Sequence, residues 1–320
     1  LSINVSGTGF DGKVVKEFKG SVVRNERFFR RKGISWKRIT SSENTIRYLP
    51  ENFIFDQSAD SLFPKSDGMF NYLLGIFNSK VISSLLEIFS ATLNLTSGSV
   101  SDIPIVFSEK NKTKIDELVI DCISISKKNW DMHETSWDFK YSPLLANKSD
   151  GLIASAYESY KTQVNERFMK LKENEEELNR IFIEIYGLGD ELTSDVLDKD
   201  ITVAKIFDKK EDIDEGIKGN KYIMTREDVV KNYLSYFVGC LMGRYSLDVE
   251  GLAYAGGDFD LDKYSSFNVD VDGVLPLTDA QYFEEDIVEI FIQFLKVTFG
   301  EEHLNENLNF IASELKGKQT

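Results

Sequence analysis

The spacing of apolar residues predicts strands and turns near the beginning of the chain and mostly helices after about residue 68. Apolar and polar residues alternate over 13–18 and again over 52–56, which is typical of half-buried strands. Over 68–89 the apolar residues recur every three or four positions, which predicts one helix with a single buried face. The polar segment 93–105 then predicts a loop.

The remaining pattern is dominated by helices. A helical period returns over 112–130, and a long amphipathic helix is expected after Gly151, with Gly187 as its C-cap. Residues 188–222 are acidic and rich in turn-forming residues, and we expect exposed loops at Asp198–Asp200 and Glu211–Glu215. Thr225 is the predicted N-cap of the next helix, followed by a glycine-rich and acidic loop over 251–272. Two last helices are expected over about 283–299 and 303–315.

These elements predict an α+β fold that consists of a mixed α/β domain, a long spacer helix and a mostly α-helical C-terminal lobe. The predicted boundaries are 1–130, 131–190 and 191–320. The segment that contains Trp137, Phe139 and Leu144 reads as a structural joint before the long helix, and we expect all three side chains to be buried in it.

Composition supports an ordered protein. With 320 residues, 42% hydrophobic and 12% aromatic, the chain can bury a core distributed over two or three lobes. It begins at Leu1 with loop-like residues and not with an apolar signal sequence, so we expect a piece of a longer protein. No apolar run is long enough to span a membrane, and Cys122 and Cys240 read as buried thiols of a cytoplasmic protein.

Charge is distributed very unevenly. The net charge of −15 argues at first against nucleic acid, yet the segment from Lys13 to Arg47 has eleven basic residues against three acidic ones. Its local charge is +8, so the remainder of the chain has a charge of −23. We call this segment the basic strip. It is either a nucleic-acid contact surface or a strip that docks on the acidic part of its own chain.

Recognisable catalytic and metal-binding patterns are missing from the sequence. The acidic run Asp258–Asp262 is followed by Lys263 and Val269, where a calcium loop needs glycine and glutamate. His133 and His303 lie far apart with no cysteine pair beside them, which disfavours zinc. A glycine-rich phosphate loop and a nucleophilic serine elbow are also missing.

Three blocks, in this order, resemble a known family. The first runs from Gly33-Ile34-Ser35-Trp36 through Arg47-Tyr48-Leu49-Pro50 to the Asn78-Ser79-Lys80 motif and the Asn94–Pro104 loop. The second is Trp137–Leu145 with Asn179–Leu188, and the third includes Val238–Asp248, Gly251–Gly257 and Phe291–Phe310. Together they resemble the C-terminal half of large bacterial adenine-specific DNA methyltransferases, namely the type IIG restriction-modification enzymes and PglX of BREX phage-defence systems.

The resemblance implies a division of labour. An upstream catalytic domain would flip an adenine and methylate N6 from S-adenosylmethionine, while this chain would hold double-stranded DNA and select the sequence. The chain has five prolines, none adjacent, so it lacks the Asn/Asp-Pro-Pro-Tyr/Phe tetrapeptide of such enzymes. We therefore expect no catalytic residue, cofactor or metal here, and S-adenosylmethionine only in the catalytic domain.

The predicted DNA-contact residues belong mainly to the basic strip. Arginine and lysine suit phosphates and guanine, whereas asparagine suits adenine. Most of the contacts would be to phosphate, with Asn44 and Asn94 as weaker candidates for reading bases. The predicted set is Arg24, Arg27, Arg30, Arg31, Lys37, Arg38, Asn44, Arg47 and Asn94. The alternative function is a protein-interaction scaffold whose acidic C-terminal lobes recruit other defence-system subunits.

Overall fold

The computed structural model describes residues 25–38, 46–55, 58–89, 95–270, 272–276 and 286–315. The chain forms two compact units. The first unit comprises Leu1–Asn78 with Ile82–Ile105, and the second comprises Ser79–Val81 with Val106–Thr320. The helix that ends at Trp130 therefore groups with the second unit. The functional boundaries at 130 and 190 stay predictions.

The first unit is built on a three-stranded antiparallel sheet with the order β2–β1–β3. Its strands are β1 (Gly33–Lys37), β2 (Arg47–Leu49) and β3 (Ala59–Leu62). Alternation along β1 buries Ile34 and Trp36 on one face. The Trp36 indole Nε1 donates a hydrogen bond to the Leu95 carbonyl at 3.0 Å, and the Leu95 amide donates to the Arg38 carbonyl at 2.8 Å. These two bonds fasten residue 95 to the central strand.

The prediction of a strand over 52–56 is wrong for its described residues. Asn52 has φ 70°, in the left-handed region, and residues 53–55 form no strand. The Asn52 amide donates to the Arg30 carbonyl at 3.1 Å, and the Arg30 amide donates to the Phe53 carbonyl at 2.8 Å. These two hydrogen bonds hold residues 52–53 in a turn, so they do not pair as a strand. The other predicted strand, 13–18, lies outside the described residues.

The first unit contains several short helices where the spacing of its apolar residues predicts one helix. The stretch expected to be one helix is a 3-10 turn η2 (Asp67–Met69), α1 (Phe70–Phe77) and α2 (Lys80–Phe89). The chain breaks at Asn78, whose side chain donates to the Leu74 carbonyl at 2.9 Å and competes with the helical backbone. The predicted loop 93–105 contains the short helix α3 (Ser97–Ser101), with Thr96 as its N-cap. A further 3-10 turn, η1 (Glu26–Phe28), precedes β1.

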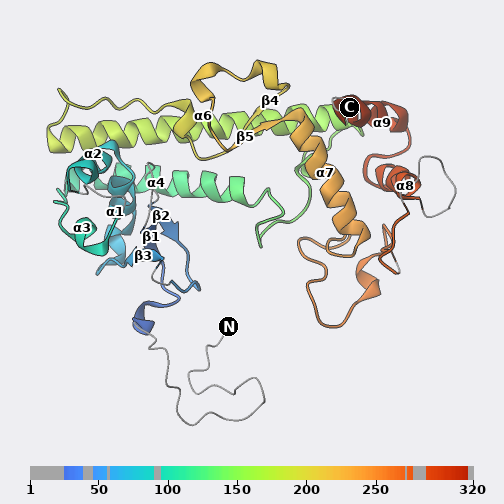
Figure 1. Cartoon of the computed structure of the whole chain (residues 1–320), viewed down its shortest axis with the longest axis horizontal. Coiled ribbons are helices and arrows are strands. Elements are labelled where there is room, and N and C mark those ends of the chain that lie inside the picture. Colours follow the sequence, from blue (N-terminus) through green and yellow to red (C-terminus); the bar gives the residue numbers. More distant parts are fainter. Residues whose placement is uncertain are drawn as a thin grey trace, which may run out of the picture. The chain divides into compact units, whose positions relative to one another are not determined.

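The second unit is organised around the long helix α6 (Ile153–Tyr186), as Figure 1 shows. Helix α4 (Glu109–Trp130) packs along it, and the short helix α5 (Pro143–Ala146) precedes it. Gly187 has φ 67°, and the Leu188 amide donates to the Ile183 carbonyl at 3.0 Å, which closes the helix end. The predicted long helix and its glycine C-cap are confirmed.

Residues 188–222 contain more secondary structure than the turn-rich sequence predicted, although most residues of Asp198–Asp200 and Glu211–Glu215 are exposed as expected. They include the 3-10 turns η3 (Asp198–Asp200), η4 (Lys210–Asp212) and η5 (Glu215–Ile217). Strand β4 (Lys205–Phe207) pairs in parallel with β5 (Ile223–Thr225). The Asn165 side chain on α6 accepts from the Ile206 amide at 2.8 Å and donates to the Ile206 carbonyl at 3.1 Å. An acidic segment is thereby fastened to the helix, and Ile201, Val203, Ile206 and Ile217 within it are buried.

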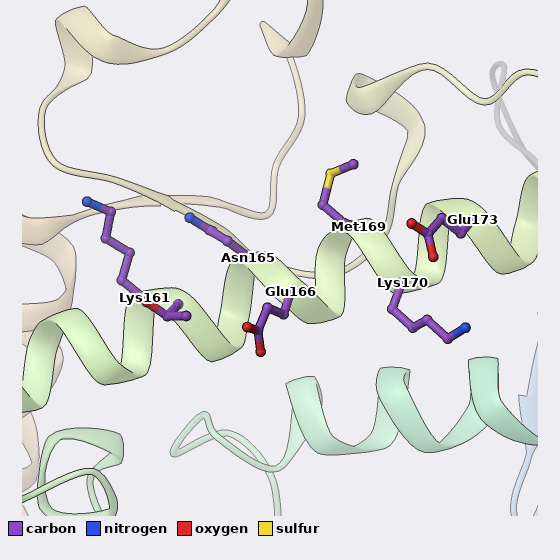
Figure 2. A pocket seen from close by; sticks show the side chains of 7 residues that line it. Lys161, Asn165, Glu166, Met169, Lys170 and Glu173 are labelled. Carbon is purple, nitrogen blue, oxygen red and sulfur yellow. The ribbon is translucent and has the colours of Figure 1, made fainter.

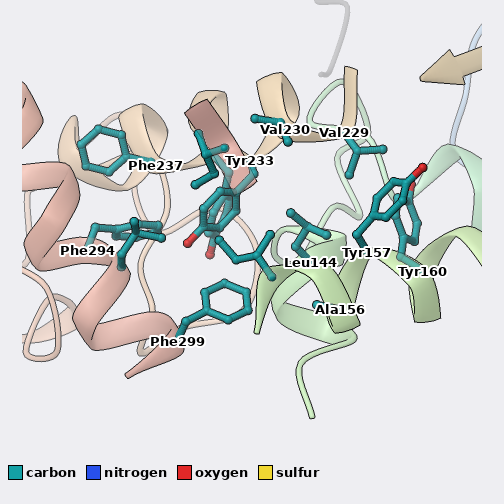
Figure 3. Packing of buried hydrophobic residues seen from close by; sticks show 14 of the residues in the cluster. Leu144, Ala156, Tyr157, Tyr160, Val229, Val230, Tyr233, Phe237, Phe294 and Phe299 are labelled. Atoms are coloured by element: carbon teal, nitrogen blue, oxygen red, sulfur yellow. The ribbon is translucent and has the colours of Figure 1, made fainter. Parts of the chain in front are cut away.

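Helices α7 (Arg226–Leu241), α8 (Ile287–Phe299) and α9 (Leu304–Leu315) complete the second unit, with the 3-10 turn η6 (Leu261–Lys263) between α7 and α8. Thr225 forms the predicted N-cap in a capping box, because its amide donates to the Asp228 carboxylate at 2.7 Å. An aromatic core that includes Tyr233, Phe237 and Phe294 joins these helices to α5 and α6 (Figure 3). The predicted α+β fold with a helical C-terminal lobe is confirmed.

The joint before α6 is only partly as predicted. Phe139 and Leu144 are buried, but Trp137 is 86% exposed, so its predicted burial is wrong. Phe139 enters the core instead, with its ring centroid 5.9 Å from that of Tyr236 and 5.2 Å from that of Tyr245. The Phe139 ring therefore occupies the core position beside Tyr236 and Tyr245, and Trp137, two residues earlier, faces solvent.

Candidate nucleic-acid interface

The outer face of the three-stranded sheet has polar and basic side chains. Ser35 and Lys37 alternate with the buried Ile34 and Trp36, so they lie on the opposite face of β1. The strand register places Arg47 and Ser61 directly across from Ser35 on its two sides. The Ser61 hydroxyl donates to the Ser35 hydroxyl at 3.2 Å. We call Arg47, Ser35 and Ser61, with Lys37 beyond them, the polar row.

The structure describes six of the predicted basic contact residues, and all six are exposed. They are Arg27, Arg30, Arg31, Lys37, Arg38 and Arg47, which we call the basic set. Within the described part of the chain, Arg27, Arg30, Arg31 and Arg38 form no ion pair, whereas the Arg47 guanidinium donates to the Ile46 carbonyl at 2.8 Å. Four of these cations are therefore available to an anionic partner. Arg24, Asn44 and Asn94 lie outside the described residues and stay predictions.

An aromatic group beside the basic set was not singled out from the sequence. Phe28 and Phe63 are stacked with ring centroids 5.0 Å apart, and Phe55 lies 5.4 Å from Phe63. The Arg27 guanidinium lies 4.8 Å from the centroid of Phe28, and that of Arg31 lies 5.8 Å from it. A cavity of about 200 Å³ adjoins these rings, lined by Asn25, Phe28, Phe55, Ser61 and Phe63. The sequence does contain a pattern that could have indicated this aromatic group. Basic and aromatic residues, which together are typical of nucleic-acid contacts, are interleaved in Arg27-Phe28-Phe29-Arg30-Arg31.

A larger hollow of about 660 Å³ follows one stretch of α6. Figure 2 shows that its lining side chains diverge: Asn165 and Met169 point to one side of the helix, and Glu166 and Lys170 to the other. Asn165 is already bonded to Ile206, and the Lys161 ammonium lies 2.7 Å from the Asp208 carboxylate. A binding site needs a few polar groups that converge on a ligand, and these do not converge.

The strongest electrostatic cluster in the second unit is structural. The Asp208 carboxylate accepts a hydrogen bond from the Tyr157 hydroxyl at 2.7 Å and lies 2.8 Å from the Arg226 guanidinium. Desolvation acts to raise the pKa of Asp208, but hydrogen bonds from Lys161, Arg226 and Tyr157 outweigh it and hold that pKa well below its usual range. The cluster joins α6 to the start of α7 and holds the fold together.

Neither of the two cysteines is activated as a nucleophile. Burial raises the pKa of Cys122 to about 12 and that of Cys240 to about 12, so both thiols stay protonated and unreactive near neutral pH. Over the described ranges, no three His, Cys, Asp or Glu side chains come together as metal ligands. None of the described helices combines the length and apolar character needed to cross a membrane.

Comparison with known proteins identifies relatives. No family model matches the chain. It is 38% identical over 297 residues to the adenine-specific methyltransferase PglX of Lacticaseibacillus casei (strain Zhang), and 34% identical over 315 residues to the adenine-specific methyltransferase BrxX of Escherichia coli O9:H4 (strain HS). These alignments cover 91% and 95% of this chain but 23% and 25% of the relatives, so the chain spans about a quarter of their length. The chain is therefore a homologue of a segment of the PglX and BrxX adenine-specific methyltransferases, which confirms the resemblance drawn from its motifs.

Proposed function

We propose that this chain is the DNA-binding, sequence-recognition portion of an adenine-N6-specific DNA methyltransferase that acts in restriction-modification or BREX phage defence. The observation that carries the proposal is the basic set, six exposed cations in a chain whose net charge is −15. Double-stranded DNA and the upstream methyltransferase domain would be its partners, in the cytoplasm, and S-adenosylmethionine would bind to the upstream domain.

The first unit offers the two kinds of contact that sequence recognition needs. Phosphate contacts position a protein on the duplex, and Arg27, Arg30, Arg31 and Arg38 have the charge and exposure for this. Base contacts select the sequence, and arginine pairs with the guanine edge in the major groove. Arg47 belongs to the polar row on the outer face of the sheet, so among the described residues it is our candidate for reading a base.

A gel-shift titration with the purified chain and a random-sequence duplex tests the proposal. We expect binding whose logarithmic affinity falls linearly with the logarithm of salt concentration, because each phosphate contact releases counterions. Absence of binding even at low salt would contradict the proposal and favour the scaffold function. Activity gives a second test: the chain alone should transfer no labelled methyl group from S-adenosylmethionine to adenine-containing DNA.

One observation favours the scaffold as a second candidate. Trp137 is 86% exposed, and Tyr141 and Leu252 are further exposed apolar side chains of the second unit. The Gly251 amide donates to the Lys140 carbonyl at 2.9 Å, which brings the neighbourhoods of Tyr141 and Leu252 together. Exposed aromatic residues are enriched at protein interfaces. Co-purification with the upstream methyltransferase domain, lost on Trp137→Ala, would support an interaction role that can coexist with DNA binding.

A further inference from the structure

The cavity at Phe28, Phe55 and Phe63 has the composition of a nucleobase site. Its three rings provide apolar faces and edges, and aromatic side chains are the platforms on which unstacked bases bind. Its volume of about 200 Å³ is below the roughly 300–1,000 Å³ of typical small-molecule pockets. The cavity therefore suits one planar base and not a whole nucleotide.

Two polar groups at the rim have unused hydrogen-bonding capacity. Within the described part of the chain, the Asn25 side-chain amide forms no hydrogen bond, and it has both a donor and an acceptor. The Ser61 hydroxyl donates to Ser35, which leaves its oxygen lone pairs free to accept. An amide and a hydroxyl beside aromatic rings match the donors and acceptors on the edge of a base.

The fold builds this cavity at one end of the outer face of the sheet. Gly33 alternates with Ser35 along β1, so a side chain at position 33 would point to the outer face. A Cβ there would lie 2.8 Å from the Phe63 ring, so glycine is what allows Phe63 to lie over the sheet. Ser61 belongs both to the cavity lining and to the polar row that contains Arg47.

Positive charge lies beside the same rings. The guanidinium groups of Arg27 and Arg31 lie 4.8 Å and 5.8 Å from the centroid of Phe28. Neither is ion-paired among the described residues, so both are free to hold the phosphates on either side of a base. A plain hydrophobic mini-core would account for the stacked rings, but it would not need a cavity with an exposed amide and two cations at its edge.

We propose that the cavity between Phe28, Phe55 and Phe63 binds one unstacked nucleobase of DNA while Arg27 and Arg31 hold the adjacent phosphates. This assignment rests on the proposed DNA-binding function and deepens it. A base in an intact duplex is covered on both faces by its neighbours, so the site selects a base that has left the stack. Methylation of a flipped adenine would disrupt stacking beside the recognition sequence, which is where such a base arises.

Fluorescence anisotropy with three labelled duplexes tests the site. One duplex is fully paired, the second has a single bulged thymidine, and the third has a bulged abasic residue at the same place. The abasic probe has the same extra phosphate and the same bend but no base. We expect the purified chain to bind the thymidine bulge about tenfold more tightly than the abasic bulge, the scale of one base stacked on an aromatic ring.

Variants then locate the effect. Phe28→Leu keeps an apolar side chain but removes the ring, and should reduce the tenfold preference to nearly none. Phe28→Tyr keeps the ring and should retain the preference. Phe29→Leu is the matched control, because Phe29 is adjacent in sequence and packs edge-on against Phe55, with a centroid distance of 5.2 Å, but does not line the cavity. Thermal unfolding checks that each variant is folded.

The outcomes separate the site from the proposed function. Equal binding of the thymidine and abasic bulges, or an undiminished preference in a folded Phe28→Leu variant, would overturn the site while leaving salt-dependent DNA binding intact. Failure to bind any of the three duplexes would overturn the DNA-binding function and the site with it.

Discussion

The side chain of Asn307, on α9, caps the first turn of α6, whose residue Ile153 lies more than 150 positions earlier in the sequence. Its Oδ1 accepts from the Ile153 amide at 2.8 Å, and its Nδ2 donates to the Gly151 carbonyl at 2.9 Å. Leu152, the residue at the N-cap position, contributes no side-chain bond. Helix α9 therefore stabilises the start of the long helix.

Asn307→Ala should destabilise the second unit by about 1–3 kcal/mol, because it leaves a buried amide donor without a partner. Urea unfolding followed by circular dichroism measures this loss. Asn305→Ala, at an exposed position on the same helix, is the control and should change stability by less than about 0.5 kcal/mol. Equal stability of the two variants would contradict the capping role.

Replacement of Asp208 should make stability respond differently to pH. The folded pKa of Asp208 lies below its unfolded value of about 3.9, so its stabilising contribution is present above pH 4 and is lost as the pH falls through the folded pKa. Asp208→Asn should cost about 1–3 kcal/mol at pH 7, and the difference from wild type should shrink below about pH 4.

Urea unfolding at pH 7, 5 and 3 provides the comparison for Asp208. Asp138→Asn is the control, because the Asp138 carboxylate forms an exposed ion pair with Lys127 at 2.5 Å. Exposed pairs contribute about 0–1 kcal/mol. A constant deficit for Asp208→Asn from pH 7 to pH 3 would mean that the loss comes from packing and not from charge.

The aromatic residues of the joint should differ in their effect on stability. Phe139 is 3% exposed and contacts Tyr236 and Tyr245, so Phe139→Ala should cost roughly 3–5 kcal/mol. Trp137→Ala should leave the melting temperature unchanged, since the indole faces solvent. Differential scanning calorimetry of the two variants measures their melting temperatures. A much lower melting temperature for Trp137→Ala would show that the indole packs against the protein.

Charge reversal in the basic set should weaken DNA binding without unfolding the chain. Arg30 and Arg31 are exposed, so Arg30→Glu with Arg31→Glu should lower affinity on every sequence and reduce the salt slope by roughly 0.9 for each lost phosphate contact. In a full-length methyltransferase that contains this segment, the same double reversal should abolish methylation.

The matched control for this reversal is Lys209→Glu with Lys210→Glu, two adjacent exposed lysines of the second unit. It makes the same change in net charge at a different place. If both reversals weaken binding equally, only the overall charge matters. If the arginine reversal has no effect, Arg30 and Arg31 do not contact DNA.

Close packing at Gly239, in α7, should make an alanine there destabilising. A Cβ at this position would lie 2.6 Å from the ring of Tyr245, which is buried and stacked on Tyr236 with centroids 5.3 Å apart. Overpacking costs about 1–3 kcal/mol, more than the roughly 1 kcal/mol that alanine adds to helix propensity. Thermal unfolding should show the loss. Gly216→Ala, where nothing lies within 4 Å, should be neutral.

Local signals in the sequence determined the helices of the second unit. The apolar stripe of α6, the glycine that ends it and the capping box at Thr225 act through residues a few positions apart, so their pattern is sufficient to predict them. The concentration of basic residues before residue 47 is likewise a property of the sequence alone. The family relationship was also readable from motifs that lie in order along the chain.

Only the tertiary structure shows which of two similar aromatic residues is buried. It also shows which side chains from distant parts of the sequence contact one another. Trp137 and Phe139 both look like core aromatics, but only Phe139 is buried, where its ring packs edge-on against Tyr236 and Tyr245. Strands β4 and β5 are only three residues each, too short for a periodic pattern, and β4 is held by the bonds from Asn165. The nucleobase cavity depends on Phe28, Phe55 and Phe63 meeting across a turn. These contacts depend on side-chain packing and on hydrogen bonds between residues far apart in the sequence. The spacing of hydrophobic residues does not predict either of them.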